Sequence, residues 1–214
     1  MKALLFDFDG TLVDSMPCWT EKVLNILRIT NTPYPENIIE LITPLGDKGT
    51  AEYFRNQLNV PLTYEEMFDL MDSYALPMYR DKIPLKESVA EFLNNMSEKY
   101  SLNVLTASPH KMLDPCLKRL GIYGAFDNVW SCDDFKTTKS DVNIYKKVAE
   151  KLGCKVKDIA FFDDNIVAIE TAAKAGMMTV GVYDLSAESF KSKMKTCTDL
   201  YIYSFKELLV KNIF

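Results

Sequence analysis

The chain has 214 residues, 48% of them apolar and 26% charged, which are the proportions of a globular protein with one core or a core plus a small second domain. A net charge of −5 argues against nucleic acid as a partner, because binding to the phosphate backbone relies on clustered Lys and Arg. Its apolar runs are too short for a membrane-spanning helix or for a signal peptide, so we expect a cytoplasmic protein without a membrane partner.

Apolar runs rich in Val, Ile, Leu, Phe and Tyr recur along the chain, with segments of helical periodicity between them. The runs predict strands at 3–6, 102–105, 128–130, 159–162, 179–182 and 200–203. The periodic segments predict helices at 87–100, 111–120, 142–152, 166–175 and 205–211. Because buried parallel strands are connected through helices, this alternation predicts an α/β fold with a doubly wound parallel sheet.

Residues 15–82 interrupt the alternation, because they contain amphipathic runs but no convincing strand. The runs predict helices at 19–29, 50–58 and 64–79. We interpret the segment as a small helical cap domain inserted after the first strand. The predicted domains are an α/β core of residues 1–14 and 83–214, and a cap of residues 15–82.

The first predicted strand is followed by Asp7-Phe8-Asp9-Gly10-Thr11. Side chains two residues apart on an extended chain point the same way, so the carboxylates of Asp7 and Asp9 converge at the strand's C-terminal end. A divalent cation such as Mg²⁺ would relieve their repulsion, because it prefers hard oxygen ligands. The alternative is an Asp-Gly turn closing a hairpin, but no strand follows within hairpin distance.

A second acidic pair, Asp163-Asp164, follows the strand at 159–162. Ends of parallel strands fall on one edge of the sheet, the edge where open α/β folds bind ligands, so both pairs are expected there. Thr106 directly follows the predicted strand at 102–105 and would place a hydroxyl and backbone N–H groups at the same edge, suited to phosphate oxygens. Taken singly, Asp164 and Thr106 could each belong to a helix cap instead.

Lys139 lies in a polar loop just before the helix at 142–152, where an isolated lysine is usually only solvated. The five cysteines are scattered without C-x-x-C spacing, which argues against disulfides and a zinc site. The single histidine, His110, is interpreted as a helix N-terminal residue rather than a catalyst. The run 191–195, which carries three lysines, is interpreted as a solvated helix face.

These four motifs follow one another in a characteristic order: Asp-x-Asp-Gly-Thr, a strand-end Thr, a loop Lys and a strand-end Asp-Asp. In this the chain resembles the haloacid dehalogenase (HAD) superfamily over essentially its whole length. It is most similar to members with a C1-type helical cap, such as phosphoglycolate phosphatases and β-phosphoglucomutases. The segment Asp-Phe-Asp-Gly-Thr-Leu-Val-Asp-Ser is the most specific match. Lys139-Ser140 departs from the frequent Lys-Pro pattern, which leaves Lys136 as a second candidate.

The resemblance implies a role for each motif. Asp7 would be the nucleophile that forms an aspartyl-phosphate, and Asp9 the general acid/base. The implied ligands of Mg²⁺ are the carboxylates of Asp7 and Asp164, the backbone carbonyl of Asp9, and Asp163 directly or through water. The implied phosphate-binding residues are Asp9, Gly10, Thr106, Ala107 and Lys139.

The implied activity is the hydrolysis of a small phosphorylated metabolite by a monomer or weak homodimer. Asp9 favours phosphoryl transfer over dehalogenation, because the dehalogenases of the superfamily lack this second aspartate. Trp19 stands where the related sugar-phosphate mutases carry a histidine, so hydrolysis is preferred and a mutase is the alternative. A catalytically silent binding module with the same fold is a hypothesis of a different class.

The cap is expected to select the substrate and to open and close about hinges near 13–16 and 81–84. Lys48 could reach a distal anion of the substrate, although a surface lysine on a loop is the simpler interpretation. The cap aromatics are mostly expected in the cap core: Trp19, Tyr53, Phe54, Tyr74 and Tyr79.

Overall fold

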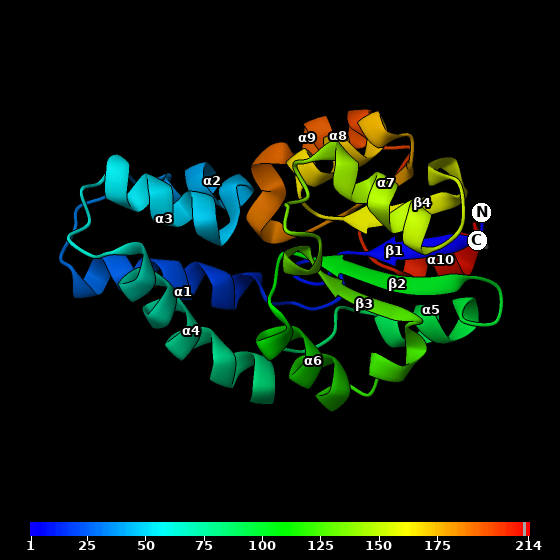
Figure 1. Ribbon diagram of the computed structural model, residues 1–214, viewed down its shortest axis with the longest axis horizontal. Coiled ribbons are helices and arrows are strands. Elements are labelled where there is room, and N and C mark those ends of the chain that lie inside the picture. The colour runs from blue at the N-terminus through cyan, green and yellow to red at the C-terminus, as the bar shows by residue number, and fades with distance from the viewer. Residues whose placement is uncertain (212) are drawn as a thin grey trace.

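A computed structural model describes residues 1–211 and 213–214, and its centre is a six-stranded parallel sheet (Figure 1). The spatial order is β3-β2-β1-β4-β5-β6. The strands are β1 Ala3–Phe6, β2 Ser101–Thr106, β3 Asn128–Ser131, β4 Ile159–Asp163, β5 Met178–Val182 and β6 Leu200–Ile202. From β1 the chain adds β2 and β3 on one side, and then returns to add β4, β5 and β6 on the other side. The gap between β1 and β4 is therefore the switch point of the sheet, where such folds bind ligands.

Helices cover both faces of the sheet, which confirms the predicted doubly wound α/β fold. The helices of this core are α5 Val89–Met96, α6 His110–Arg119, α7 Val142–Lys151, α8 Ile166–Ala175, α9 Lys191–Cys197 and α10 Lys206–Lys211. Short 3-10 helices are η2 Tyr123–Ala125, η3 Cys132–Phe135, η4 Val156–Asp158 and η5 Leu185–Phe190. Among the described residues, none of the helices combines the length and apolar character needed to cross a membrane.

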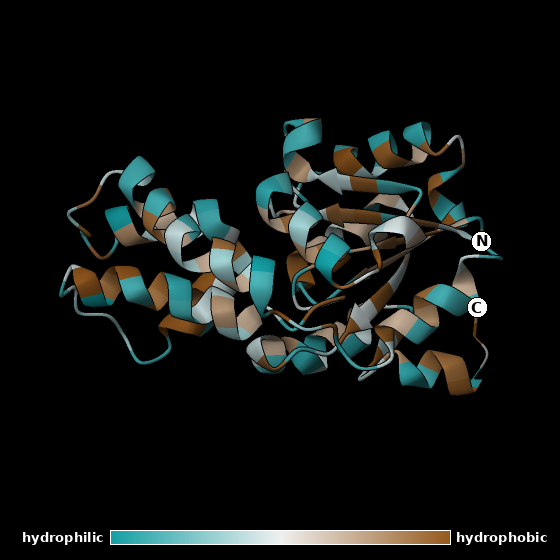
Figure 2. Ribbon diagram, turned by 90° about the horizontal axis from the view of Figure 1, so that it is seen from below, coloured by the Kyte–Doolittle hydropathy of each residue, from teal (hydrophilic) through white to brown (hydrophobic). Residues whose placement is uncertain are grey.

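Alternate residues of β1 belong to two separate apolar clusters. Leu4 and Phe6 pack with residues of α5, α6 and α10, whereas Ala3 and Leu5 pack with residues of α7, α8 and α9. This two-sided burial explains why the strand reads as an unbroken apolar run. Figure 2 shows hydrophobic colour concentrated along the strands at the centre of the core.

The segment after β1 forms a helical unit beside the core (Figure 1). Its elements are α1 Met16–Ile29, α2 Ile38–Ile42, η1 Thr43–Leu45, α3 Gly46–Asn56 and α4 Tyr64–Asp81. Val23, Ile26, Phe54 and Met67 belong to an apolar cluster of this unit alone. We therefore propose that residues 15–82 are a cap domain and that residues 1–14 and 83–214 form the core.

The cap also touches the core. Tyr79, near the end of α4, belongs to the apolar cluster of the core, and α4 packs against α6. The two chain crossings lie side by side, because Val13 and Leu85 form an antiparallel bridge and the Asp14 N–H donates to the carbonyl of Pro84. The crossings coincide with the predicted hinge segments.

Several element boundaries differ from the sequence prediction. The prediction missed α2, and α3 begins at Gly46 rather than at 50, so Lys48 lies on a helix and not on a loop. Helix α5 begins at Val89 rather than at 87, because Ser88 has a left-handed backbone with φ of +62°. The hydrophobic pattern of a sequence does not reveal a single residue with left-handed backbone. The predicted start of the helix therefore differs from the observed one.

Candidate active site

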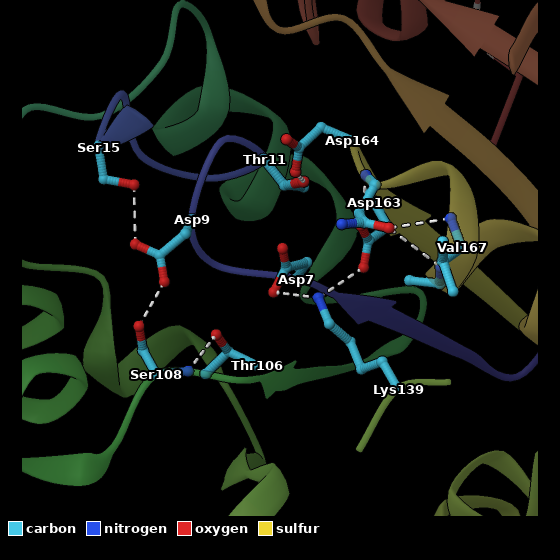
Figure 3. Close-up of polar contacts among 12 residues, drawn as sticks. Asp7, Asp9, Thr11, Ser15, Thr106, Ser108, Lys139, Asp163, Asp164 and Val167 are labelled. Atoms are coloured by element: carbon cyan, nitrogen blue, oxygen red, sulfur yellow. Dashed lines mark hydrogen bonds and ion pairs between the residues drawn. The ribbon is translucent and has the colours of Figure 1, made fainter. Parts of the chain in front are cut away.

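The carboxyl edge of the sheet collects the four predicted motifs (Figure 3). Asp7 directly follows β1, Thr106 ends β2 and Asp163 ends β4, and each is at most 4% exposed. Lys139 reaches the same place from the loop before α7. The expectation that these motifs share one edge agrees with the geometry, because parallel strands in register end together.

Three buried carboxylates form an acid cluster, defined here as Asp7, Asp163 and Asp164, whose closest oxygens all lie within 4.8 Å of one another. Burial raises the pKa of Asp7 to about 7, with Lys139 opposing the shift and Asp163 and Asp9 adding to it. Burial, together with repulsion from Asp163 and Asp7, raises the pKa of Asp164 well above its usual range. The cluster therefore holds more negative charge than its surroundings neutralise.

Lys139 is the cation inside this cluster. Its Nζ lies 2.8 Å from Asp7 Oδ1 and 2.7 Å from Asp163 Oδ2. Burial alone would lower the pKa of Lys139, but Asp163 and Asp7 raise it well above the usual value, so the ammonium stays charged. The Tyr145 hydroxyl donates to the Lys139 carbonyl at 2.9 Å and holds the loop. The alternative candidate, Lys136, is exposed with φ of +52°, so the structure brings Lys139 and not Lys136 to the site.

Asp9 is held by three hydroxyl groups that the sequence did not predict. Ser15 Oγ and Tyr79 Oη donate to Asp9 Oδ1 at 2.7 and 2.5 Å, and Ser108 Oγ donates to Asp9 Oδ2 at 2.5 Å. Figure 3 shows the Asp9 carboxylate turned away from Asp7, toward Ser15 and Ser108. Its side chain is therefore not part of the acid cluster. Ser15 and Tyr79 come from the two ends of the cap, so Asp9 sits at the joint between cap and core.

Gly10 brings its backbone against the acid cluster. It has φ of +72°, and a Cβ there would lie 2.5 Å from Asp164 Oδ2, so glycine is required for both conformation and space. Thr11 Oγ1 donates to Asp164 Oδ1 at 3.1 Å. Lys86, which sequence reasoning missed, donates to the carbonyl of Gly10 at 2.6 Å and to Asp184 Oδ2 at 2.9 Å. It thereby fixes the Gly10 loop from the second chain crossing.

The phosphate-binding candidates beyond β2 lie in an open turn. The Thr106 Oγ1 accepts the Ser108 N–H at 3.1 Å, which leaves the Thr106 hydroxyl proton to donate elsewhere. Ala107 is exposed between them. Exposed backbone next to a buried hydroxyl provides the donors that a phosphate group needs.

The remaining candidates lie away from the acid cluster. His110 begins α6, as predicted, with Nδ1 2.9 Å from Asp114 and Nε2 3.0 Å from Asp134. Hydrogen bonds to these carboxylates raise the pKa of His110. Lys48 is exposed and lies 3.8 Å from an Asp133 carboxylate oxygen on η3, so it bridges cap and core on the outside. All five cysteines are free.

A model of the haloacid dehalogenase-like hydrolase family matches residues 4–182. The chain belongs to this family. Among curated relatives, the phosphorylated carbohydrates phosphatase of Thermotoga maritima is 24% identical over 83% of this chain and 82% of its own length. Hexitol phosphatase B of Escherichia coli K12 is 23% identical over 99% of this chain and 96% of its own.

Solved structures of HAD-like proteins share the fold over nearly the whole chain. CbbY from Rhodobacter sphaeroides, in complex with phosphate, has a TM-score of 0.81 at 19% identity and covers 97% of this chain and 96% of its own. A Thermotoga maritima protein assigned provisionally as a β-phosphoglucomutase has a TM-score of 0.75 at 22% identity, with 100% of both chains covered. The predicted superfamily, the capped α/β fold and the assignment as a hydrolase are confirmed.

Proposed function

We propose that this protein is a Mg²⁺-dependent phosphatase that hydrolyses a small phosphate monoester through a phosphorylated Asp7. The observation that carries the proposal is the Asp7 carboxylate, buried at the switch point between the ammonium of Lys139 and the carboxylates of Asp163 and Asp164. Curated relatives named as phosphatases over most of the chain support the same reaction class.

The residues of the acid cluster fit Mg²⁺. Asp7 Oδ1 is buried without a hydrogen-bond partner among the described residues, since the Lys139 Nζ approaches to 2.8 Å but outside hydrogen-bonding geometry. Such an oxygen is suited to a metal. Both Asp163 oxygens are in use, one toward Lys139 and one accepting the Asn165 N–H at 2.7 Å. We therefore assign direct ligation to Asp7, Asp164 and the carbonyl of Asp9, with Asp163 acting through water.

When bound, Mg²⁺ would offset the crowded negative charge of the carboxylates and of the phosphoryl oxygens. The chain's own residues perform the two displacements. An Asp7 oxygen attacks phosphorus while the bond to the leaving oxygen breaks, and Asp9 donates a proton to that oxygen. Asp9 then accepts a proton from water, the resulting hydroxide attacks phosphorus, and the bond to Asp7 breaks to release phosphate. For this, the Asp9 carboxylate must turn from its three hydroxyl partners toward Asp7.

The transferring group's oxygens would be bound by donors around Asp7. We assign this role to Lys139, the Thr106 hydroxyl and the backbone N–H groups at Gly10 and Ala107. The ammonium of Lys139 provides the local positive charge that an acidic chain otherwise lacks at this site. Donors held in position by the fold would stabilise the negative charge that develops on these oxygens.

Hydrolysis is favoured over a mutase reaction by Trp19. An acid or base at this position is what the similar mutases use, and an indole cannot serve as one. Its Nε1 donates to Asp47 Oδ1 at 2.8 Å, so the only polar group of the side chain is already engaged. Incubation with a hexose 1-phosphate and Mg²⁺ should release inorganic phosphate. Formation of the hexose 6-phosphate without phosphate release would favour the mutase.

The Asp7→Asn variant tests the nucleophile and also separates an enzyme from a silent binding module. We expect hydrolysis of 4-nitrophenyl phosphate with Mg²⁺ to fall by a factor on the order of 10⁴, because amide oxygen is a poor nucleophile. The matched control is Asp127→Asn, an exposed aspartate at the opposite edge of the sheet. Equal turnover by the wild-type protein and Asp7→Asn would contradict the proposal.

A further inference from the structure

Lys86 places one ammonium among three oxygen atoms close to the acid cluster. Its Nζ donates to the carbonyls of Gly10 and Tyr183 at 2.6 and 2.7 Å. It also donates to Asp184 Oδ2 at 2.9 Å, so the three acceptors match the three N–H donors of an ammonium. The side chains of Lys86 and Asp184 are 18% and 6% exposed, so both charges lie largely out of the solvent.

The turn after β1 is held by Lys86 at two points. The Lys86 backbone N–H donates to the carbonyl of Leu12 at 3.0 Å, and its Nζ holds the carbonyl of Gly10. One residue of the second chain crossing therefore fixes the first crossing through its main chain and its side chain. The backbone bond survives any substitution of Lys86 except proline, so the side-chain bond can be removed separately.

This turn contacts the acid cluster on both sides of Gly10. The peptide group before Gly10 carries the Asp9 carbonyl, which we assign to Mg²⁺. The peptide group after Gly10 leads to Thr11, whose hydroxyl donates to Asp164 Oδ1 at 3.1 Å (Figure 3). A Cβ on Gly10 would lie 2.5 Å from Asp164 Oδ2, so the backbone lies directly against that carboxylate. A change in the direction of the Gly10 carbonyl therefore moves two of the groups assigned to the metal.

Asp184 and Tyr183 anchor the ammonium at the end of β5. Asp184 Oδ1 accepts the backbone N–H and the hydroxyl of Ser186 at 2.9 and 2.7 Å, which leaves Oδ2 for Lys86. The Tyr183 N–H donates to the carbonyl of Ile202 on β6 at 2.8 Å. The end of the sheet at β5 and β6 therefore serves as the fixed point for the turn after β1.

The arrangement around Lys86 resembles a site for a monovalent cation. Two carbonyl oxygens and one carboxylate oxygen converge on the Nζ at distances of 2.6–2.9 Å. Stability alone does not account for the pair, because the desolvation of buried charges offsets much of their attraction. The lysine does provide a cation that is not drawn from the solvent and cannot diffuse away.

We propose that Lys86 is a positioning residue whose ammonium acts as a built-in cation for the turn after β1. By holding the Gly10 carbonyl, it keeps the Asp9 carbonyl and the Asp164 carboxylate directed at one metal ion. Asp184 keeps the ammonium in place. This inference rests on the proposed function, because it concerns the Mg²⁺ site of the same reaction.

Calorimetric titration with Mg²⁺ separates position from charge. Burial raises the pKa of Asp164 and Lys86 opposes the rise, so the ammonium also acts on that carboxylate by charge. Loss of this charge alone would strengthen Mg²⁺ binding, whereas a displaced turn weakens it. We expect Lys86→Met to raise the Kd for Mg²⁺ by about tenfold or more, as is usual when a group that orients metal ligands is lost.

The control for this titration is Lys82→Met, which removes an exposed lysine of the same chain crossing and should leave the Kd unchanged. A lower Kd for Lys86→Met would mean that Lys86 acts only by charge. An unchanged Kd with a lower Tm would mean a purely structural role. Either result overturns the proposal.

A double variant covers poor folding of Lys86→Met, which leaves Asp184 buried without its counter-ion. Adding Asp184→Asn removes both charges, and the amide oxygen can still accept the Ser186 N–H. The net charge then equals that of the wild-type protein. The double variant should still raise the Kd for Mg²⁺ by about tenfold, through position alone. An unchanged Kd would contradict the positioning role.

Small ammonium ions test the cation site directly. Lys86→Ala leaves room for a free cation, which can enter because the site is partly exposed. We expect its kcat for 4-nitrophenyl phosphate with Mg²⁺ to be about 30-fold below that of the wild-type protein, and ethylammonium chloride to raise it about fivefold or more. Tetramethylammonium chloride, which has the charge but no N–H donor, should not. Lys86→Met fills the space and should respond to neither salt. Equal kcat values of Lys86→Ala in the two salts would contradict the cation site.

Failure of the proposed function would look different. The wild-type protein would then give no heat of Mg²⁺ binding and would leave 4-nitrophenyl phosphate intact, and both proposals would fall. Mg²⁺-dependent hydrolysis by the wild-type protein, with the same Kd for Mg²⁺ in the Lys86 variants, overturns the positioning role alone.

Discussion

At the carboxyl edge of the sheet two of three buried carboxylates contact the ammonium of Lys139, whereas within the cap the buried Lys22 meets the single carboxylate of Asp47. The first arrangement favours a further cation, because like charges at close range oppose ionisation. In the second, one ammonium is matched by one carboxylate. An unbalanced charge cluster therefore marks where a metal and a phosphate are expected, whereas the balanced pair joins α1 to α3 within the cap.

Among changes at the carboxyl edge of the sheet that leave the catalytic side chains in place, Gly10→Ala should give the largest loss of kcat. The new Cβ would displace the Asp164 carboxylate, and a shift of about 1 Å at a catalytic group costs roughly 100-fold in kcat. The matched control is Gly121→Ala, which has a similar φ of +73° but open space around the new Cβ. Both variants should lose about 1–2 kcal/mol of unfolding free energy from backbone strain. Equal kcat values for the two would show that the contact with Asp164 is unimportant.

Removal of Mg²⁺ should make the unfolding free energy depend on pH. Without metal, the raised pKa of Asp7, about 7, and the raised pKa of Asp164 keep protons bound in the folded state that the unfolded chain has released. This stabilising contribution is complete below the ordinary pKa of 3.8 and is lost as pH rises through about 7. Saturating Mg²⁺ should restore about 2–3 kcal/mol of the unfolding free energy, most of it above pH 7. This corresponds to a rise in Tm of roughly 5–10 °C.

Thermal unfolding between pH 5.5 and 8.5, with EDTA or with MgCl₂, measures this effect. His110 loses its proton in an overlapping range, because its pKa is also raised, so the comparison is made in a His110→Gln background. A Tm that Mg²⁺ raises equally at every pH would argue against ligation by Asp7 and Asp164.

Neutralising one carboxylate should have opposite effects in the two regions. Asp47→Asn leaves Lys22 buried without its counter-ion and should lower the unfolding free energy by about 2 kcal/mol, less than for a fully buried pair because Asp47 is partly exposed. Asp164→Asn in EDTA removes like-charge repulsion and should raise the unfolding free energy. Urea denaturation of the two variants and the wild-type protein measures both changes in unfolding free energy. A lower unfolding free energy in both variants would contradict the contrast between the two regions.

Ser88→Gly should give the smallest change in unfolding free energy. Ser88 lies between the two regions, where the chain returns from the cap to the core. The φ of Ser88 is +62° and its side chain makes no capping bond, so glycine relieves backbone strain while adding freedom to the unfolded chain. We expect a net gain of about 0.5 kcal/mol, or 1–2 °C in Tm, with unchanged kcat. The control Ser97→Gly, at the other end of α5 with φ of −62°, should be destabilised.

The sequence predicted what depends on local pattern. Continuous apolar runs identified the strands, and the acids that follow β1 and β4 identified the edge on which Asp7 and Asp164 lie. Lys139 was chosen over Lys136 because motif order provided information that its own neighbours did not.

Contacts between distant segments could not be read in the same way. Tyr79 and Asp9 are separated by 70 positions, and Lys86 and Gly10 by 76. Nothing in their local sequence names a partner, since a tyrosine on an amphipathic helix packs equally well in an apolar core. Lys22 did carry a signal, because it interrupts the apolar face that Trp19 and Val23 begin. Its meaning required the position of Asp47 on another helix.

The paired chain crossings at Val13 and Leu85 have an evolutionary consequence. Because the chain leaves and re-enters the core at adjacent points, a cap of different length or shape can be inserted there without moving any strand. Simple excision would uncover the apolar surface that Tyr79 covers, so replacement is easier than deletion. A lineage with this architecture can acquire new substrates by exchanging one insert while its reactive centre stays intact.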